Sequence, residues 1–342
     1  MSPTRTYDLH AHCLVPSVQA LVAEQDGFRA EQALQARQMG AASMEHTQGL
    51  FPTWMQRLTD LDTRLALMDE MGVDVEVVSV SPTQYHYWAE LDLAEEIVRL
   101  ANDGVAELVA RMPARLQGLG TVALQHPQLA TRQLEAAVEE QGLRGAVISS
   151  AINGVDLSDA AFDPFWAAAE RLGGVVFIHP FGCSLDERID RWYLANIVGQ
   201  PAETAVALSH LIFGGVLDRF PSLKVLAAHG GGYLPLYAGR SDHGYAVRPE
   251  SHTCARLPSE YLRRMWFDSV VHSPDVLRRL VDAVGVSQVV LGTDYPFDMG
   301  VDDPLALLDA VSALTSDERD AIAGTNAARL LGLDEATGSV GG

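Results

Sequence analysis

The stretch that decides the fold lies at residues 6–13, which read TYDLHAHC. A short apolar run of this kind predicts a buried β-strand, and residues two apart in a strand point to the same side of it. His10 and His12 can therefore present two imidazole rings to a single point. Imidazole nitrogens bind zinc and similar divalent metals, so the pair predicts one part of a metal site at the end of the first strand.

Seven further apolar runs follow along the chain. They cover residues 73–80, 116–124, 143–150, 174–180, 223–229, 265–271 and 288–293. Helical patterns lie between them, with clear examples at residues 62–71, 128–141 and 274–284. Strands that alternate with helices predict an α/β fold, and eight such strands predict a (β/α)8 TIM barrel.

The alternative is a doubly wound open sheet. We favour a barrel because reactive side chains follow the first, fifth, sixth and eighth apolar runs. In a barrel the C-terminal ends of all strands meet at one face, and this face carries the active site. The first and the last strand become neighbours only if the sheet closes. We therefore expect a single metal-dependent barrel domain over residues 1–335.

Two segments depart from the alternation of strand and helix. Residues 14–59 form a long insertion after the first strand, rich in Gln, Met and Ala. Insertions of this length at the catalytic face usually cover the site, so a lid is expected here. The second departure is residues 230–264, where a short helical stretch gives way to a polar loop. Residues 336–342 are expected to form a flexible tail.

Two reactive side chains end later strands and are candidate metal ligands beside the histidine pair. His179 ends the fifth run and Asp294 ends the eighth. Taken alone, His179 could be a buried structural histidine, and Asp294 could begin a turn. A metal bound by three histidines needs a further ligand or a base, and a carboxylate can serve as either.

His229 ends the sixth run and precedes three glycines. Glycine-rich segments can cradle phosphates, but the Walker pattern and its lysine are absent. The glycines are instead expected to let the backbone approach the metal centre closely. We expect His229 to act as a general acid/base or to orient water, because a neutral imidazole near an ion exchanges protons near pH 7.

Two further residues need a separate interpretation. His86 lies in the aromatic segment QYHYW at residues 84–88, directly after the second run, and could line the substrate pocket or pack in the core. Cys13 directly follows His12. Because neighbours in a strand point to opposite faces, its thiol is expected to point away from the metal.

The composition argues against several kinds of partner and setting. The formal net charge of −21 argues against nucleic acid, because phosphate binding needs concentrated Lys and Arg. Three cysteines without paired spacing favour a reducing, cytoplasmic setting. The polar N-terminus lacks the apolar core of a signal peptide. No apolar run reaches the roughly 18 to 20 residues of a membrane helix, so no membrane partner is expected.

These residues, in this order, resemble the amidohydrolase superfamily. The closer resemblance is to its decarboxylase branch, typified by 2-amino-3-carboxymuconate 6-semialdehyde decarboxylase. It rests on the HAH motif at residues 10–12, His179, AHGGG at 228–232 and GTDYPF at 292–297. It extends over most of the chain to Met68-Asp69, Trp192, PAET at 201–204, Gly239-Arg240, PSEY at 258–261 and Asp268-Ser269.

The resemblance implies one catalytic divalent metal ion in a (β/α)8 barrel, usually zinc, with manganese or another divalent ion as the alternative. His10, His12, His179 and Asp294 would be the metal ligands. His229 would orient or deprotonate the metal-bound water.

The resemblance also implies a homodimer. Arg240 would reach the site of the neighbouring subunit and hold a substrate carboxylate, which a planar guanidinium binds well through two parallel hydrogen bonds. Trp192 and Phe297 would contact the substrate in the pocket.

One departure from the resemblance concerns the substrate. In the decarboxylases that typify the branch, an arginine of the insertion helps to bind the substrate, but the matching residues 50–53 read LFPT. Arg57 or His46 could substitute, and the apolar Phe51 suggests a different substrate. The fourth apolar run ends in Ser149-Ser150, without a lysine that could bridge two metals, so a site for a single metal is expected.

The leading prediction is a non-oxidative decarboxylase, a carboxy-lyase that acts on a small unsaturated or aromatic carboxylic acid. The alternative is a hydrolase or hydratase that uses the same site on a small lactone, ester, amide or unsaturated acid. A catalytically silent binding protein is disfavoured, because every expected ligand is present.

Overall fold

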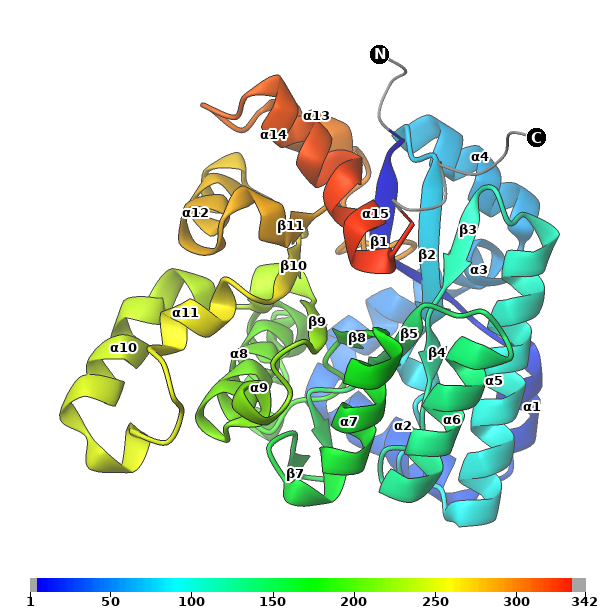
Figure 1. The fold of residues 1–342 in the computed structure, drawn as a ribbon. Helices are drawn as coiled ribbons and strands as arrows, with labels where there is room; N and C mark the ends of the chain where they lie inside the picture. Colours follow the sequence, from blue (N-terminus) through cyan, green and yellow to red (C-terminus); the bar gives the residue numbers. More distant parts are fainter. Residues whose placement is uncertain (1–4, 334–342) are drawn as a thin grey trace, which may run out of the picture.

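The computed structural model describes residues 5–333, and a parallel sheet forms its centre (Figure 1). The expected tail at residues 336–342 lies outside the described residues. The strands are β1 (Tyr7–Cys13), β2 (Val75–Val80), β3 (Leu116–Gly118), β4 (Gly120–Thr121), β5 (Gly145–Ile148), β8 (Val175–Ile178), β9 (Lys224–Ala227), β10 (Trp266–Asp268) and β11 (Val289–Val290). Each of the eight predicted apolar runs contains at least one of these strands. A short hairpin, β6 (Ala151–Ile152) and β7 (Val155–Asp156), follows β5.

The order of the strands in space follows their order in the chain. One set reads β1-β2-β3 and the other reads β4-β5-β8-β9-β10-β11, and neighbouring strands within both sets are parallel. β3 and β4 are two parts of one strand, separated by Leu119, whose N–H still donates to the Val78 carbonyl at 2.9 Å. This order, with helices between successive strands, is that of the predicted (β/α)8 barrel.

Backbone hydrogen bonds join the segment after β11 to β1. The Asp294 N–H donates to the His10 carbonyl at 2.8 Å, and the His12 N–H donates to the Tyr295 carbonyl, also at 2.8 Å. We call this contact between β1 and the segment after β11 the seam. Because its partners follow β11 and do not belong to it, the seam is not a regular strand ladder. It nevertheless places the C-terminal end of the last strand beside that of the first.

The central strands are buried on both faces, as expected for a parallel sheet covered by helices. Every residue of β1 and β2 is buried. Helices α5 (Leu91–Arg111), α6 (Pro127–Glu139) and α7 (Asp163–Leu172) lie side by side outside the strands (Figure 1). Their buried apolar residues recur at helical spacing, so each helix packs one stripe against the sheet.

The other α-helices complete the outer layer. They are α1 (Pro16–Val22), α2 (Asp26–Met39), α3 (Ala41–Thr59), α4 (Leu61–Met71), α8 (Gln200–Phe213), α9 (Val216–Arg219), α10 (Ala238–Val247), α11 (Pro258–Leu262), α12 (Pro274–Val284), α13 (Pro304–Asp309), α14 (Ser316–Asp320) and α15 (Asn326–Leu331). α12 has the predicted bounds because the Ser273 side chain accepts the Val276 N–H at its start. Within the described part of the chain, we find no helix with both the length and the apolar character needed to cross a membrane.

The insertion after β1 consists of the helices α1, α2 and α3. Two contacts tie α2 to the segment that follows β8. The Arg37 guanidinium pairs with the Asp186 carboxylate at 2.9 Å, and the Gln38 amide donates to the Cys183 carbonyl at 2.8 Å. These contacts fix one side of the insertion to a loop at the C-terminal end of the barrel.

Gly145, at the start of β5, provides a test of the strand packing. Its φ is +143°, and a Cβ atom built there would lie 2.0 Å from the Val175 carbonyl oxygen of β8. We expect Gly145→Ala to lower the free energy of unfolding by about 2–4 kcal/mol, measured by urea denaturation, because the backbone must shift. The control is Gly49→Ala in α3, where no atom lies within 4 Å. Equal unfolding midpoints for the two variants would contradict this packing.

Candidate metal centre and active site

Four of the side chains selected from the sequence converge at the C-terminal ends of the strands. His10 and His12 lie on β1, His179 directly follows β8, and Asp294 follows β11. One ligand atom from each of them lies within 4.8 Å of the other three, and all four residues are buried. The structure thus brings the four predicted ligands to one point, compatible with a divalent metal.

The donor atoms of this cluster face one another closely. The Nε2 atoms of His10 and His12 are 3.2 Å apart. The Asp294 Oδ1 atom lies 3.2 Å from the first of these nitrogens and 3.3 Å from the second. Three imidazoles and a carboxylate at this spacing form the type of donor set that binds zinc and related divalent ions.

Hydrogen bonds on the far side of two rings fix their orientation. The His10 Nδ1 atom lies 2.6 Å from the Asp268 carboxylate, and the His179 Nδ1 atom lies 3.0 Å from the Pro180 carbonyl. An imidazole that donates from Nδ1 carries its lone pair on Nε2, so both rings can offer an Nε2 lone pair to the centre. The His179 Nε2 atom is buried and has no hydrogen-bond partner among the described residues. A cation at the centre would satisfy it, so these residues fit a metal.

The electrostatics of the cluster also favour a cation. Burial alone would lower the pKa of His10, but the Asp294 and Asp268 carboxylates outweigh it and raise this pKa to about 10. Burial would raise the pKa of Asp294, yet the neighbouring histidines hold it well below its usual value. Burial and the nearby rings of His12 and His10 keep the pKa of His179 well below that of free histidine. The centre therefore combines an ionised carboxylate with a strong preference for one positive charge.

His229 lies beside this cluster and contacts the other oxygen of Asp294. Its Nε2 atom is 3.4 Å from Asp294 Oδ2, and 14% of its side chain is exposed. Its Nδ1 atom has no hydrogen-bond partner among the described residues. His229 thus lies beside the cluster and lines the adjoining cavities, without belonging to the group of four.

The glycines after His229 allow close packing of the turn that they form. A Cβ atom on Gly231 would lie 2.6 Å from the Phe267 ring, and one on Gly232 would lie 2.1 Å from the Pro201 carbonyl oxygen. Both residues also have positive φ. They therefore permit a tight turn packed against β10 and α8.

Two cavities meet at His229 and Asp294. One has a volume of about 260 Å³ and is lined by His179, by Phe297 and by residues of the insertion. The other has a volume of about 350 Å³ and is mainly apolar. The insertion residues in the first cavity are Gln35, Gln38, Met39, Met44, Thr47 and Trp54. Asn196 and Gln200 line both cavities, and no residue that the structure places along either wall is Lys or Arg.

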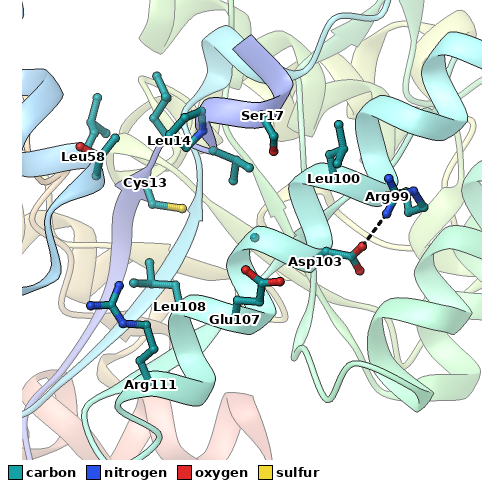
Figure 2. A pocket seen from close by; sticks show the side chains of 14 residues that line it. Cys13, Leu14, Ser17, Leu58, Arg99, Leu100, Asp103, Glu107, Leu108 and Arg111 are labelled. Atoms are coloured by element: carbon teal, nitrogen blue, oxygen red, sulfur yellow. Dashed lines mark hydrogen bonds and ion pairs between the residues drawn. The ribbon is translucent and has the colours of Figure 1, made fainter. Parts of the chain in front are cut away.

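A separate pocket of about 480 Å³ has a different position (Figure 2). It is lined by Cys13, by residues of α1 and by the α5 residues Arg99 and Glu107, and by none of the four clustered residues. Cys13 therefore faces away from His12, as the alternation along the strand predicts. This pocket has no connection with the predicted chemistry.

The predicted substrate residues divide into two groups. Phe297 lines the smaller cavity, and its ring lies 5.5 Å from the His12 ring. Arg240 lies exposed on α10 and Trp192 is 78% exposed, and neither lines the two cavities within this chain. His86 also does not line them, because its backbone turns with a φ of 48° and its buried ring pairs with Glu31 of α2 at 2.9 Å.

Sequence reasoning missed several residues that shape the site. Asp268 supports the His10 ring through a contact of 2.6 Å, and Asn196 and Gln200 line both cavities. The signal for Asp268 was its place in the seventh apolar run, although it precedes the end of that run at residue 271. Asn196 and Gln200 gave no comparable signal, since they lie in a helical stretch.

Comparison with known proteins identifies the family. Residues 7–333 match the amidohydrolase family. The chain belongs to this family. The 2-amino-3-carboxymuconate-6-semialdehyde decarboxylase of Dictyostelium discoideum is 35% identical over 331 residues, which cover 96% of this chain and 91% of that protein. The match confirms the resemblance, including its decarboxylase branch.

Two solved structures support the same assignment. The 5-carboxyvanillate decarboxylase from Sphingomonas paucimobilis has a TM-score of 0.82 and 29% identity, and the match covers 96% of this chain and 99% of that chain. A dihydroxybenzoic acid decarboxylase from a Polaromonas species, solved with bound manganese, has a TM-score of 0.82, 25% identity and 98% coverage of both chains. These likenesses confirm the barrel fold of this amidohydrolase-family enzyme.

Loss of one clustered ligand should release the metal. We expect His179→Ala to reduce the metal content from about one divalent ion per chain to less than about a tenth, because the ligand set drops from four to three. Elemental analysis after dialysis measures this content. The control is His243→Ala on the exposed side of α10. Unchanged metal content in His179→Ala, with circular dichroism showing a folded protein, would remove this residue from the site.

Proposed function

We propose that this chain is a non-oxidative decarboxylase that acts on a small aromatic or unsaturated carboxylic acid with the help of a divalent metal. The observation that carries the proposal is the buried cluster of three histidines and Asp294, with His229 beside it at the junction of two cavities. The names of the relatives support the reaction type, since the three relatives described above are all decarboxylases.

The metal would be held by His10, His12, His179 and Asp294. Three imidazoles and one carboxylate suit zinc, which we propose as the native ion. The manganese bound in the Polaromonas relative supports a divalent ion in general and makes manganese the alternative. A divalent ion in this position supplies Lewis-acid polarisation of substrate oxygen atoms and acidifies water.

The side chains around the cluster would position the substrate and move the proton. Trp54 and Phe297 offer two perpendicular rings 5.2 Å apart, and Asn196 and Gln200 offer amide groups for polar substituents. His229 would deliver a proton to the substrate carbon that carries the carboxylate. The bond to the carboxylate then breaks, its electron pair returns to the unsaturated system, and carbon dioxide leaves. This scheme needs no oxidant or reductant.

We also propose a homodimer in which Arg240 enters the site of the partner subunit to hold a substrate carboxylate. Two observations support this role. The cavity walls described within one chain contain no Lys or Arg, so a basic side chain for the carboxylate would have to come from outside these walls. Large exposed apolar side chains, including Trp192, Tyr233 and Tyr237, belong to the segments that precede α8 and α10. Exposed apolar side chains of this size favour association.

Substrate screening tests the proposed reaction. Hydroxybenzoates and unsaturated ring-cleavage acids are incubated with the metal-loaded enzyme, and release of carbon dioxide is measured. A parallel panel contains small lactones, esters and amides, and unsaturated acids are assayed for added water. We expect carbon dioxide from at least one acid. Hydrolysis or hydration without carbon dioxide release from any acid would replace the decarboxylase by the hydrolase or hydratase alternative.

His229→Asn separates proton transfer from metal binding. We expect the variant to keep about one metal ion per chain, because His229 is not one of the four ligands, while kcat falls by about 100-fold or more. Elemental analysis and carbon dioxide release measure the two effects, and His243→Asn serves as the control. Normal turnover by His229→Asn would show that another group moves the proton.

Arg240 can be tested by mixing two impaired variants, with activity measured at substrate concentrations well below KM. We expect Arg240→Gln to raise KM by about tenfold or more, because the carboxylate loses a bidentate partner. When this variant exchanges subunits with His229→Asn, each mixed dimer regains one complete site. Activity should then return to about a quarter of the wild-type value at equal mixing. No recovery on mixing, with exchange verified by mass spectrometry, would show that Arg240 does not act across the interface.

A further inference from the structure

Asp268, the last residue of β10, is a fully buried carboxylate whose four hydrogen bonds connect two parts of the site. Its Oδ2 atom accepts the His10 ring Nδ1–H at 2.6 Å and the His229 backbone N–H at 2.9 Å. Its Oδ1 atom accepts the backbone N–H groups of Gly230 and Val270, at 2.8 and 3.1 Å. One side chain therefore contacts a metal ligand and the turn that carries the proposed proton donor.

The first contact determines which nitrogen of His10 faces the centre with a lone pair. A carboxylate can only accept, so the Nδ1 atom of His10 must donate to it. The lone pair of the neutral ring then lies on Nε2, the atom that faces His12 and Asp294. An acceptor at this place therefore sets both the tautomer and the angle of the ring.

The other contacts support an unfavourable turn. His229 has a φ of 56° and Gly230 has a φ of 60°, both in the left-handed region. For a residue with a side chain this conformation costs about 1–2 kcal/mol. The turn aims two successive N–H groups at one carboxylate, which offsets this cost. The same turn places the His229 ring beside Asp294 Oδ2.

We infer that Asp268 is a positioning residue that sets the metal affinity through His10 and, through the turn at His229, the placement of the proton donor. The second half of this inference rests on the proposed function, whereas the first half concerns metal binding alone. Asp268 touches neither the metal position nor the cavities, so it acts only through these two histidines.

Asp268→Asn is the sharpest test because it keeps the size of the side chain and changes one acceptor into a donor. The new NH2 group would face either the His10 ring or the N–H groups of the turn. In the first case the Nδ1 atom of His10 must accept a hydrogen bond. The proton of the neutral ring then lies on Nε2, the atom that faces the metal position. We expect the zinc affinity, measured by competition with a chelator, to fall about 10- to 100-fold. With bound cobalt, the visible spectrum should also shift.

The control is Asp8→Asn. Asp8 is as deeply buried as Asp268 and accepts backbone N–H groups of His10 and Thr293, but it does not hydrogen-bond to an imidazole ring. General weakening of the barrel would affect both variants alike. We expect the zinc affinity of Asp8→Asn to stay within about threefold of the wild-type value. Equal losses in the two variants would overturn the specific role of Asp268.

Saturating metal separates the two halves of the inference. At zinc concentrations that fill the site of Asp268→Asn, we expect kcat to remain at least about tenfold low with little change in KM, because the His229 turn stays disturbed. Wild-type kcat under these conditions would overturn the second half. If no acid is decarboxylated even by the wild-type enzyme, the proposed function fails, while the affinity and spectral measurements still decide the first half.

A second variant covers the case in which Asp268→Asn does not fold. Asp268→Ala removes the carboxylate and leaves space for a small anion. Added formate should restore part of the zinc affinity of this variant, whereas chloride at the same ionic strength should not. Equal zinc affinity in formate and in chloride would show that the carboxylate at this position has no role in metal binding.

Discussion

The site depends on the seam between β1 and the segment that follows β11. Asp294 donates its N–H to the His10 carbonyl at 2.8 Å, and His12 donates its N–H to the Tyr295 carbonyl, also at 2.8 Å. These bonds place the last predicted ligand beside the first two. Once the seam forms, the parallel strands between its two sides bring His179 and His229 to the same end of the barrel.

The centre combines groups that would be costly to bury one at a time. An ionised carboxylate in the interior loses its hydration, and imidazole lone pairs that face one another repel. Asp294 lies within 3.5 Å of three histidine rings, and Asp268 accepts the Nδ1–H of His10 on the far side of that ring. The cost of burying each group is offset by its contacts with the others. The barrel thus positions the donor atoms so that a bound cation would satisfy them.

The sequence predicted those site residues that lie near the C-terminal ends of the apolar runs. Each clustered residue lies in the C-terminal half of an apolar run or directly after it, so a closed order of strands predicts that the four lie at one face. The bounds of α12 were also predictable, because Ser273 and Pro274 specify its start. The role of Asp268 could not be predicted in this way. Its contact with His10 joins two residues that lie 258 positions apart in the sequence. Of the two alternatives for His86, the structure shows the buried one, because the ring contacts Glu31 of α2, a residue far away in the sequence.

The four clustered residues and part of the wall of the smaller cavity come from different parts of the chain. The ligands lie on or directly after barrel strands, whereas Met39, Met44 and Trp54 belong to the inserted helices. Mutations in the insertion can therefore reshape the space offered to a substrate and leave the reactive centre intact. In evolutionary terms, the two parts can diverge at different rates. A lineage built on this barrel can acquire new substrates through changes in the inserted helices α2 and α3 while its chemistry is inherited unchanged.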